Sequence, residues 1–257
     1  MTKIILSADS TCDLGDELKA KYQVHYYPFH IILGDKQYQD NVDITPEEIF
    51  QAYWERKILP KTAAIGVGEY LDYFRKWVEN GYQVIHLNLG SGISSAYQNC
   101  CMAARELGNV FPINSGNLSS AIGLLVVEAG KRISQGMPAP QIQKEIQELT
   151  AKCHGSFVLD TLEFLHAGGR CSAVAALGAN LLRLKPCIEV NNRDATMRVG
   201  KKYRGDLDKV LVQYTRDKLM NRDDLNLDRC FLVNAGISKE RLNLVKKTIE
   251  ECADFEH

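Results

Sequence analysis

The sequence has no long hydrophobic run, no block of like charges and no signal-peptide profile. No apolar run approaches the roughly 18 residues that a membrane-spanning helix needs, so we expect no transmembrane segment. The start, MTKIILSADST, leads directly into a strand-like run, which favours a cytoplasmic protein. The formal net charge of −1 provides no long-range attraction to nucleic acid, so we expect no nucleic-acid partner.

Eight cysteines are present, but none belongs to a CxxC pair or to a Cys/His cluster with zinc-ligand spacing. Cys100 and Cys101 are adjacent, and adjacent cysteines rarely bridge. We therefore expect reduced, mostly buried thiols, with no metal and no cofactor.

Complete motifs for nucleotide binding and for serine hydrolysis are also missing. The nearest match to a G-x-S-x-G nucleophile elbow, residues 92–96, ends in Ala96 rather than glycine. No Gly-Lys-Ser/Thr of a phosphate loop occurs, and the two G-x-G sequences lack the third glycine of a dinucleotide turn. The six histidines are scattered and form no recognisable triad or metal motif.

What the sequence does contain is the composition of a soluble globular protein of two domains. It has 257 residues, 45% of them hydrophobic and 25% charged. Strands and helices alternate through residues 1–154, which predicts a parallel-sheet α/β domain. Residues 155–257 predict a smaller mixed-sheet α/β domain. This domain would contain a helix in AVAALGANLLRL, a strand pair that turns at Asn191–Asp194, and a strand in RCFLVNAG (residues 229–236).

Three local patterns carry further predictions. HYYPFHIIL (residues 25–33) is strand-like, and GDKQYQD after it is typical of a hairpin turn and return. Thr45, Pro46 and Glu48 predict a helix start with a capping box. Asp9, Ser10 and Thr11 are candidate caps for a helix that begins near Gly15.

Small, hydroxyl-rich turns follow three predicted strands of the first domain. They are DSTCD (9–13), GSGISS (90–95) and NSGNLSS (114–120). Because ligands gather at the carboxyl ends of the strands in open parallel sheets, these turns predict a neutral anion site rich in donors. The alternative for each serine alone is a simple helix cap. Arg170, in LHAGGR, offers a forked donor for the same anion, or it pairs with an acidic side chain between the domains.

These motifs, taken in order, resemble the DegV family of bacterial fatty-acid-binding proteins. The resemblance covers nearly the whole chain, and its motifs are ADSTCDL, YQDNVDITPEEIF, PKTAAIGVGEY, GSGISSAYQNC, NSGNLSSAIGLLV, TLEFLHAGGR, ALGANLLRLKP and KKYRG.

The resemblance implies a two-domain DegV-like fold that binds a long-chain fatty acid, such as a C16 or C18 acid. Residues 1–154 would hold the carboxylate, and residues 155–257 would cover the acyl chain. Thr62 and Ser94 match the family's carboxylate-binding hydroxyls, and Arg170 would support that end of the site. The supporting loops would contribute Ser10, Ser91, Gly92 and Ser115.

The resemblance also implies a role as a partner rather than an enzyme. The protein would present the bound fatty acid to a separate fatty-acid kinase, which docks near Arg204 of KKYRG. We expect a monomer that contacts a membrane surface transiently to load its lipid. Two other functions stay open: an enzyme or sensor for a small hydroxylated or phosphorylated metabolite, and a regulatory partner in which lipid only fills the fold.

Three departures from the family pattern affect the expected site. Thr62-Ala63-Ala64-Ile65 stands where the family usually has Thr-Ser-Gln-Pro, and Asn114 replaces the usual aspartate before Ser115. The family's closing C-terminal strand, with a His-containing Gly-Pro-Gly turn, has no counterpart before His257. The set of head-group residues predicted from the resemblance is therefore incomplete.

Overall fold

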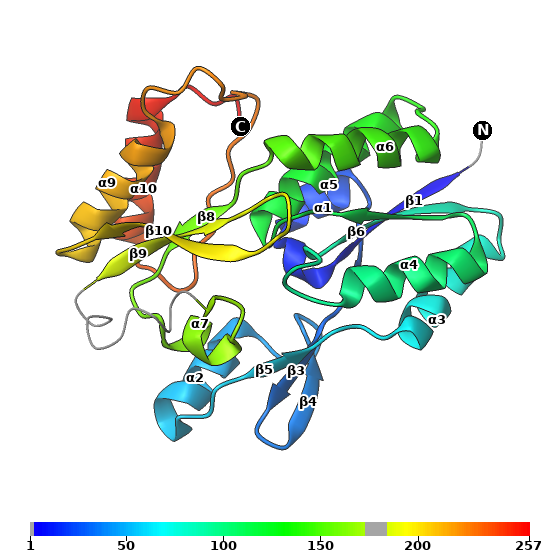
Figure 1. Cartoon of the computed structure of the whole chain (residues 1–257), viewed down its shortest axis with the longest axis horizontal. Coiled ribbons are helices and arrows are strands. Elements are labelled where there is room, and N and C mark those ends of the chain that lie inside the picture. The colour runs from blue at the N-terminus through cyan, green and yellow to red at the C-terminus, as the bar shows by residue number, and fades with distance from the viewer. Residues whose placement is uncertain (1–2, 173–183) are drawn as a thin grey trace. The chain divides into compact units, whose positions relative to one another are not determined.

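The structure, a computed structural model, describes residues 3–172 and 184–257 (Figure 1). The chain forms two compact units, which are described separately. Unit 1 is Met1–Gly155 with Val190–Thr196, and unit 2 is Ser156–Glu189 with Met197–His257. Residues 190–196 were predicted in the second domain, and the structure instead packs them within unit 1. The helix predicted from AVAALGANLLRL falls on residues 173–183, outside the described part of the chain, except for Leu184.

Unit 1 is built on a four-stranded parallel sheet with the strand order β2-β1-β6-β7. The strands are β1 Ile4–Asp9, β2 His25–Tyr27, β6 Gln83–Asn88 and β7 Val110–Asn114. Strands β1 and β6 are buried for most of their length, as expected for strands that are covered on both faces. The predicted α/β class is confirmed.

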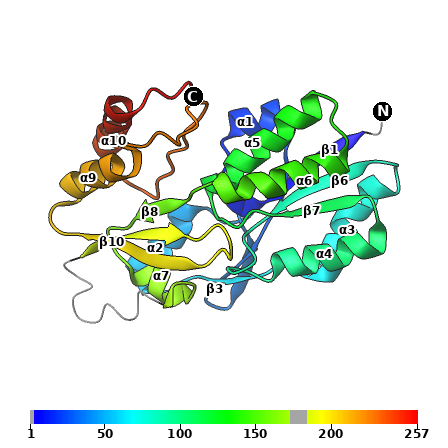
Figure 2. The same cartoon turned by 45° about the horizontal axis from the view of Figure 1, so that its top comes forward.

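Helices cover both faces of this sheet. Figure 2 shows α5 and α6 on one face and α3 and α4 on the other, in agreement with their contacts to β1, β6 and β7. These helices are α3 Val67–Val78, α4 Ala96–Leu107, α5 Ser120–Ser134 and α6 Ala139–Leu149, followed by the short helix η2 Thr150–Lys152. The fully buried core lies between sheet and helices and includes Phe74, Ile85, Leu87, Ile113, Ile122, Leu125 and Ile142. Full burial of each such side chain is worth about 1.5–3 kcal/mol.

A second, three-stranded sheet in unit 1 has the order β4-β3-β5, and both of its pairs are antiparallel. Its strands are β3 His30–Leu33, β4 Lys36–Gln39 and β5 Lys61–Ala63. The predicted hairpin from β3 to β4 is present and turns at Gly34, where φ is +65°. Residues 25–33 were predicted as one strand-like run, but they divide between the two sheets at Pro28, which has no N–H for a ladder.

The first two helices of unit 1 differ in how they begin. Helix α2, Pro46–Arg56, has the predicted capping box, in which Thr45 and Glu48 satisfy each other's backbone N–H groups. Helix α1, Asp16–Lys21, begins after Gly15 without a side-chain cap. The predicted caps were therefore wrong: Ser10–Cys12 form the short 3-10 helix η1, and the side chains of Asp9 and Ser10 bond elsewhere.

Unit 2 has a three-stranded sheet with the order β10-β9-β8, and β8 pairs antiparallel with β9. Its elements are β8 Ser156–Val158, α7 Glu163–Gly168, β9 Lys185–Val190, β10 Met197–Tyr203, α9 Leu207–Leu219 and α10 Lys239–Cys252. Helix α9 packs against α10, as Figure 1 shows. Cys187, Tyr203 and Val210 form one buried cluster between the sheet and α9.

The strand predicted at residues 229–236 is not formed. This segment has no regular secondary structure, and its side chains Leu232 and Val233 are 37% and 47% exposed. Its backbone contact is with the end of the chain, where Cys230 N donates to His257 O at 3.0 Å. An apolar run forms a strand only where a neighbouring strand accepts its hydrogen bonds, and none of the described strands pairs with this one.

Candidate functional site

The three hydroxyl-rich turns lie where β1, β6 and β7 end. The register pairs Ala8 with Leu87 and Asn88 with Asn114, so the carboxyl ends of these neighbouring strands lie together at one edge of the sheet. The turn after β6 leads into α4, and the turn after β7 leads into α5. The predicted convergence of these turns follows from the parallel pairing.

The β6 turn rests on a buried carboxylate that the sequence analysis considered only as a cap. Asp9 is fully buried, and its Oδ2 accepts from Leu89 N at 2.8 Å. Its Oδ1 accepts from Tyr70 Oη at 2.8 Å and lies 3.0 Å from His86 Nε2. Because a buried carboxylate is costly without donors, these bonds are needed where Asp9 stands. They fix the backbone immediately before GSGISS.

Tyr70 is a donor to Asp9 because its hydroxyl keeps its proton. Burial, and next the negative charge of Asp9, raise the pKa of Tyr70 well above its usual value near 10. Asn88 Nδ2 donates to the same hydroxyl oxygen at 3.0 Å. Hydrogen bonds therefore run from Asn88 at the end of β6, through the Tyr70 hydroxyl, to the Asp9 carboxylate at the end of β1.

Ser7, His86 and Asp9 are arranged like a serine, histidine and aspartate triad, yet they do not form an active site. His86 Nδ1 lies 2.9 Å from Ser7 Oγ, which itself lies 2.9 Å from Tyr73 Oη. Ser7, Asp9 and His86 are each 0% exposed. A nucleophilic serine must reach its substrate, and this one is enclosed in the sheet. The arrangement satisfies buried polar groups, and alternating polar residues in two apolar strands were the sequence signal for it.

Two of the predicted supporting serines use their hydroxyl groups in hydrogen bonds within the protein. Ser10 Oγ donates to Asp40 Oδ2 at 2.6 Å and accepts from Phe29 N at 3.1 Å. Ser115 is fully buried, and its hydroxyl donates to Asn117 O and accepts from Asn117 N. Both side chains have a donor and an acceptor partner already. They shape the turns and have no hydrogen left for a ligand.

Three other predicted hydroxyls keep their hydrogen available. Ser94 Oγ accepts from Ala96 N at 3.2 Å, and Ser91 Oγ accepts from Asn114 Nδ2 at 2.8 Å. Thr62, on β5, is exposed and pairs with Ile31 through its strand register. Within residues 3–172 and 184–257, none of these three hydroxyls has an acceptor for its hydrogen. Such hydroxyls can donate to an anion.

The β5 connection that follows Thr62 is tied to α4, the helix that follows Ser94. Asn99 Nδ2 of α4 donates to Ile65 O at 2.8 Å. Ile65 is fully buried, and the next residue, Gly66, donates its N–H to Glu69 Oε2 at the start of α3. No bond in the described structure joins Thr62 to Ser94 directly.

Gly92, predicted as part of a supporting loop, is required by a close backbone approach. A Cβ on Gly92 would lie 2.1 Å from the carbonyl oxygen of Asp194. A Cβ on Gly116 would lie 2.5 Å from Asn192 O, and one on Gly90 would lie 2.4 Å from Ala195 Cβ. Three glycines thus let residues 192–195 lie against the β6 and β7 turns within unit 1.

The two predicted arginines belong to unit 2. Arg170 follows Gly169, whose φ is +69°, and its Nη1 donates to Gly168 O at 2.5 Å. Arg204 follows β10. Both side chains are exposed, and neither forms an ion pair with an acidic side chain of the described part of unit 2.

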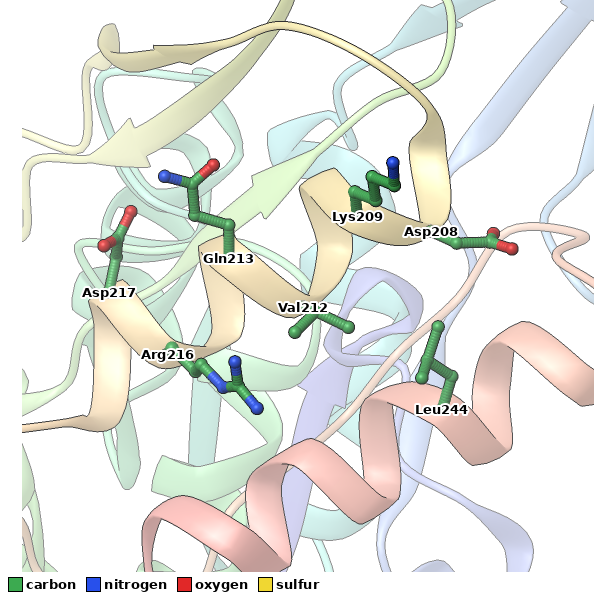
Figure 3. Close-up of a pocket in the computed structure, with 7 residues that line it drawn as sticks. All are labelled: Asp208, Lys209, Val212, Gln213, Arg216, Asp217 and Leu244. Carbon is green, nitrogen blue, oxygen red and sulfur yellow. The ribbon is translucent and has the colours of Figure 1, made fainter.

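A pocket in unit 2 lies on α9 and α10, where Val212 and Leu244 point toward each other (Figure 3). It is lined by Asp208, Lys209, Val212, Gln213, Arg216, Asp217 and Leu244. Three of its charged groups are already paired: Asp208 with Arg241, Arg216 with Glu251, and Asp217 with Lys201. None of the predicted site residues lines this pocket.

The described residues contain neither a metal-binding cluster nor a helix suited to a membrane. No three or more His, Cys, Asp or Glu side chains there are grouped to hold a metal ion. No helix there combines the length and the apolarity that crossing a membrane requires. The eight cysteines are all free thiols, and five of them are buried.

Known proteins resemble this chain along its whole length. The family model described as "Uncharacterised protein, DegV family" matches residues 2–256. A DegV domain-containing protein of Clostridium acetobutylicum is 31% identical over 255 residues, which cover 98% of this chain and 89% of that protein. One of Clostridium perfringens is 32% identical over 207 residues, which cover 80% and 74%.

Solved structures share the fold. A fatty-acid-binding DegV family protein from Thermus thermophilus has a TM-score of 0.73 and 28% identity, over 82% of this chain and 75% of that one. A stearic acid-binding protein from Eubacterium ventriosum has a TM-score of 0.78 and 24% identity, over 100% and 90%. The family model, the relatives and the fold agree with the motif order read from the sequence: the chain belongs to the DegV family.

Proposed function

We propose that this protein binds a long-chain fatty acid non-covalently, with its carboxylate at β5 and the turn after β6 and its acyl tail buried. One observation carries the proposal: Thr62, Ser91 and Ser94 have hydroxyl hydrogens without an acceptor among the described residues. The DegV family membership supports the choice of ligand, because solved members bind fatty acids.

In such a site the tail and the head group contribute differently to the free energy of binding. Burial of a tail of about 15 methylenes is worth roughly 12 kcal/mol, before the costs of association and of ordering the chain are subtracted. The head group then needs only hydrogen bonds from the protein that replace the ones it made with water. Neutral hydroxyl donors satisfy a carboxylate without a buried cation of their own.

The first experiment is native mass spectrometry of the purified protein, followed by extraction and identification of any bound molecule. We expect a mass excess of one fatty acid, and we expect Thr62→Ala/Ser94→Ala to lose it. Ser95→Ala is the matched control, because Ser95 is the neighbouring exposed serine and makes no side-chain cap to α4. An apo mass that stays unchanged after incubation with mixed fatty acids would refute the proposal.

Arg170 is included in the proposal as a support for the carboxylate, and its test is separate because it lies in unit 2. A guanidinium gives a carboxylate two parallel donors, a stronger arrangement than a hydroxyl provides. We expect Arg170→Ala to weaken fatty-acid binding by about tenfold and Arg170→Lys to restore only part of it. Equal binding by all three proteins would remove Arg170 from the site.

We further propose that the protein presents its fatty acid to a separate kinase and is not itself an enzyme. Arg204 is exposed after β10 and free of an ion pair in the described residues, which suits a docking cation. Arg204→Ala is expected to keep fatty-acid binding and to lose delivery to a fatty-acid kinase. Arg105→Ala, an exposed arginine of α4, is the charge-matched control. Retained delivery by the Arg204 variant would argue against this docking residue.

The remaining parts of the proposal concern the protein's surroundings. Eight free thiols fit a reducing, cytoplasmic compartment. A carrier of one fatty acid must load at a membrane surface, so we expect transient binding to phospholipid vesicles and a monomer in solution. Vesicle flotation and analytical ultracentrifugation test these two statements independently.

A further inference from the structure

Asn114, the last residue of β7, joins the two serine-containing turns through its side-chain amide. Its Oδ1 accepts from Ser91 N and from Gly116 N, both at 3.1 Å. Its Nδ2 donates to Ser91 Oγ at 2.8 Å. The backbone of Asn114 is held as well, because Gln147 of α6 bonds both its N–H and its C=O.

The neighbouring backbone determines which way this amide points. Two backbone N–H groups meet one atom of the side chain, and only the amide oxygen can accept from them. A flipped amide would set its NH₂ against two donors. The nitrogen must therefore face Ser91.

This orientation determines the direction of the Ser91 hydroxyl. Since Asn114 Nδ2 is a donor, Ser91 Oγ accepts from it, and the hydroxyl hydrogen points elsewhere. Across the described residues no atom accepts that hydrogen. Ser91 is half-buried, on the same turn as Ser94, and Ser94 Oγ likewise accepts, in its case from the backbone N–H of Ala96. Each hydroxyl thus keeps its hydrogen available for an acceptor.

An aspartate at position 114 would reverse this direction. Its first carboxylate oxygen could keep the two backbone N–H bonds, because these need only an acceptor. Its second oxygen would stand where Nδ2 now stands, and it would take the Ser91 hydrogen as acceptor. Replacement of the amide NH₂ by an oxygen would make the Ser91 hydrogen unavailable as a donor and would add a negative charge beside the turn.

We propose that Asn114 makes Ser91 a direct donor to the carboxylate of the bound ligand, so that the pair selects a carboxylate head group over a neutral one. The proposal rests on the proposed fatty-acid function and adds to it Asn114, which acts as a unit with Ser91. Ser91 is the donor, and Asn114 is a positioning residue that acts only through it. A hydrogen bond to a charged acceptor is stronger than one to a neutral acceptor, which is the source of the selectivity.

The test compares two ligands with the same tail: palmitate and 1-hexadecanol. Delipidated full-length protein is titrated with each, using the unchanged protein, Ser91→Ala, Asn114→Asp, the double variant and the Ser95→Ala control. We expect Ser91→Ala to weaken palmitate binding about 10- to 100-fold. The fold-loss of affinity for hexadecanol should be about ten times smaller than the fold-loss for palmitate. Asn114→Asp is expected to weaken palmitate binding at least as much. The Ser91→Ala change should then have little further effect in the Asn114→Asp background.

The outcomes separate this proposal from the function it rests on. If the unchanged protein binds neither ligand, the fatty-acid function itself fails. If it binds palmitate but Ser91→Ala stays within about threefold, Ser91 is not a donor and the inference is wrong. Equal losses for palmitate and hexadecanol, or fully additive losses in the double variant, would also overturn it. Ser91→Ala removes one half-buried hydroxyl, so its palmitate-to-hexadecanol ratio decides the matter even where Asn114→Asp does not fold.

Discussion

Replacement of Gly92 by alanine tests the close approach between the β6 turn and residues 192–195. The new Cβ would lie 2.1 Å from Asp194 O, 3.2 Å from Asp194 C and 3.3 Å from Ala195 C. An ordinary contact of a carbon with these atoms needs about 3.4–4 Å. Because all three atoms belong to the backbone, either the β6 turn or residues 192–195 must move by roughly 1 Å or more to relieve the overlap.

The size of the effect follows from this displacement. Overpacking in a well-packed site costs about 1–3 kcal/mol. For a chain of this size, each 1 kcal/mol lowers the melting temperature by about 2–4 °C. We therefore expect Gly92→Ala to melt about 2–12 °C lower than the unchanged protein. Fatty-acid binding should weaken with it, because Ser91 and Ser94 flank the residue that must move.

Gly68→Ala is the matched control for this measurement. Gly68 lies in the first turn of α3, and nothing stands within 4 Å of the Cβ it would gain. Alanine is the better helix former, so this variant should be equal to the unchanged protein or more stable by up to about 1 kcal/mol. Thermal unfolding by circular dichroism measures both. Equal melting temperatures for Gly92→Ala and the unchanged protein would show that the backbone approach is wrong.

Three further predictions concern the buried groups and the surface of unit 1. Tyr70→Phe removes one donor from the buried Asp9 carboxylate and should cost about 1–3 kcal/mol in urea unfolding; an unchanged midpoint would contradict this role. Burial by itself would raise the pKa of Glu128, but hydrogen bonds and charges of two basic neighbours outweigh it and lower the pKa. The contribution of Glu128 to stability is therefore present above about pH 4.5 and is lost as pH falls. Glu128→Gln should flatten the stability profile below that pH by about 0.5 kcal/mol, and an identical profile would refute the linkage. Burial raises the pKa of Cys12 to about 11, so iodoacetamide at neutral pH should label half-buried Cys101 well before Cys12, as peptide mass spectrometry can measure; the reverse order would contradict the burial.

Much of the fold could be predicted from local patterns. The capping box at Thr45 and Glu48, the β3–β4 hairpin and the alternation of strands and helices all depend on residues close together in the chain. Such features need few contacts from elsewhere, so a linear reading finds them. The parallel sheet then follows, because strands joined by helices pair in parallel.

Predictions failed where the outcome depends on a distant partner. The apolar run at residues 229–236 has strand-forming residues, but a strand also needs a neighbour to pair with, and the described sheet does not supply one. Residues 190–196 were assigned to the second domain by their place in the sequence. They pack with the first because three glycines, at positions 90, 92 and 116, leave room for their backbone.

The candidate site divides in the same way. The sequence alone determined which residues stand at the strand ends, and the motif order determined the family. Only the tertiary structure decided what each hydroxyl does. Ser10 and Ser115 were indistinguishable from Ser91 and Ser94 in the sequence. A hydroxyl binds a ligand only if its hydrogen has no closer acceptor, and the acceptor for Ser10, Asp40, comes from a different turn of the chain.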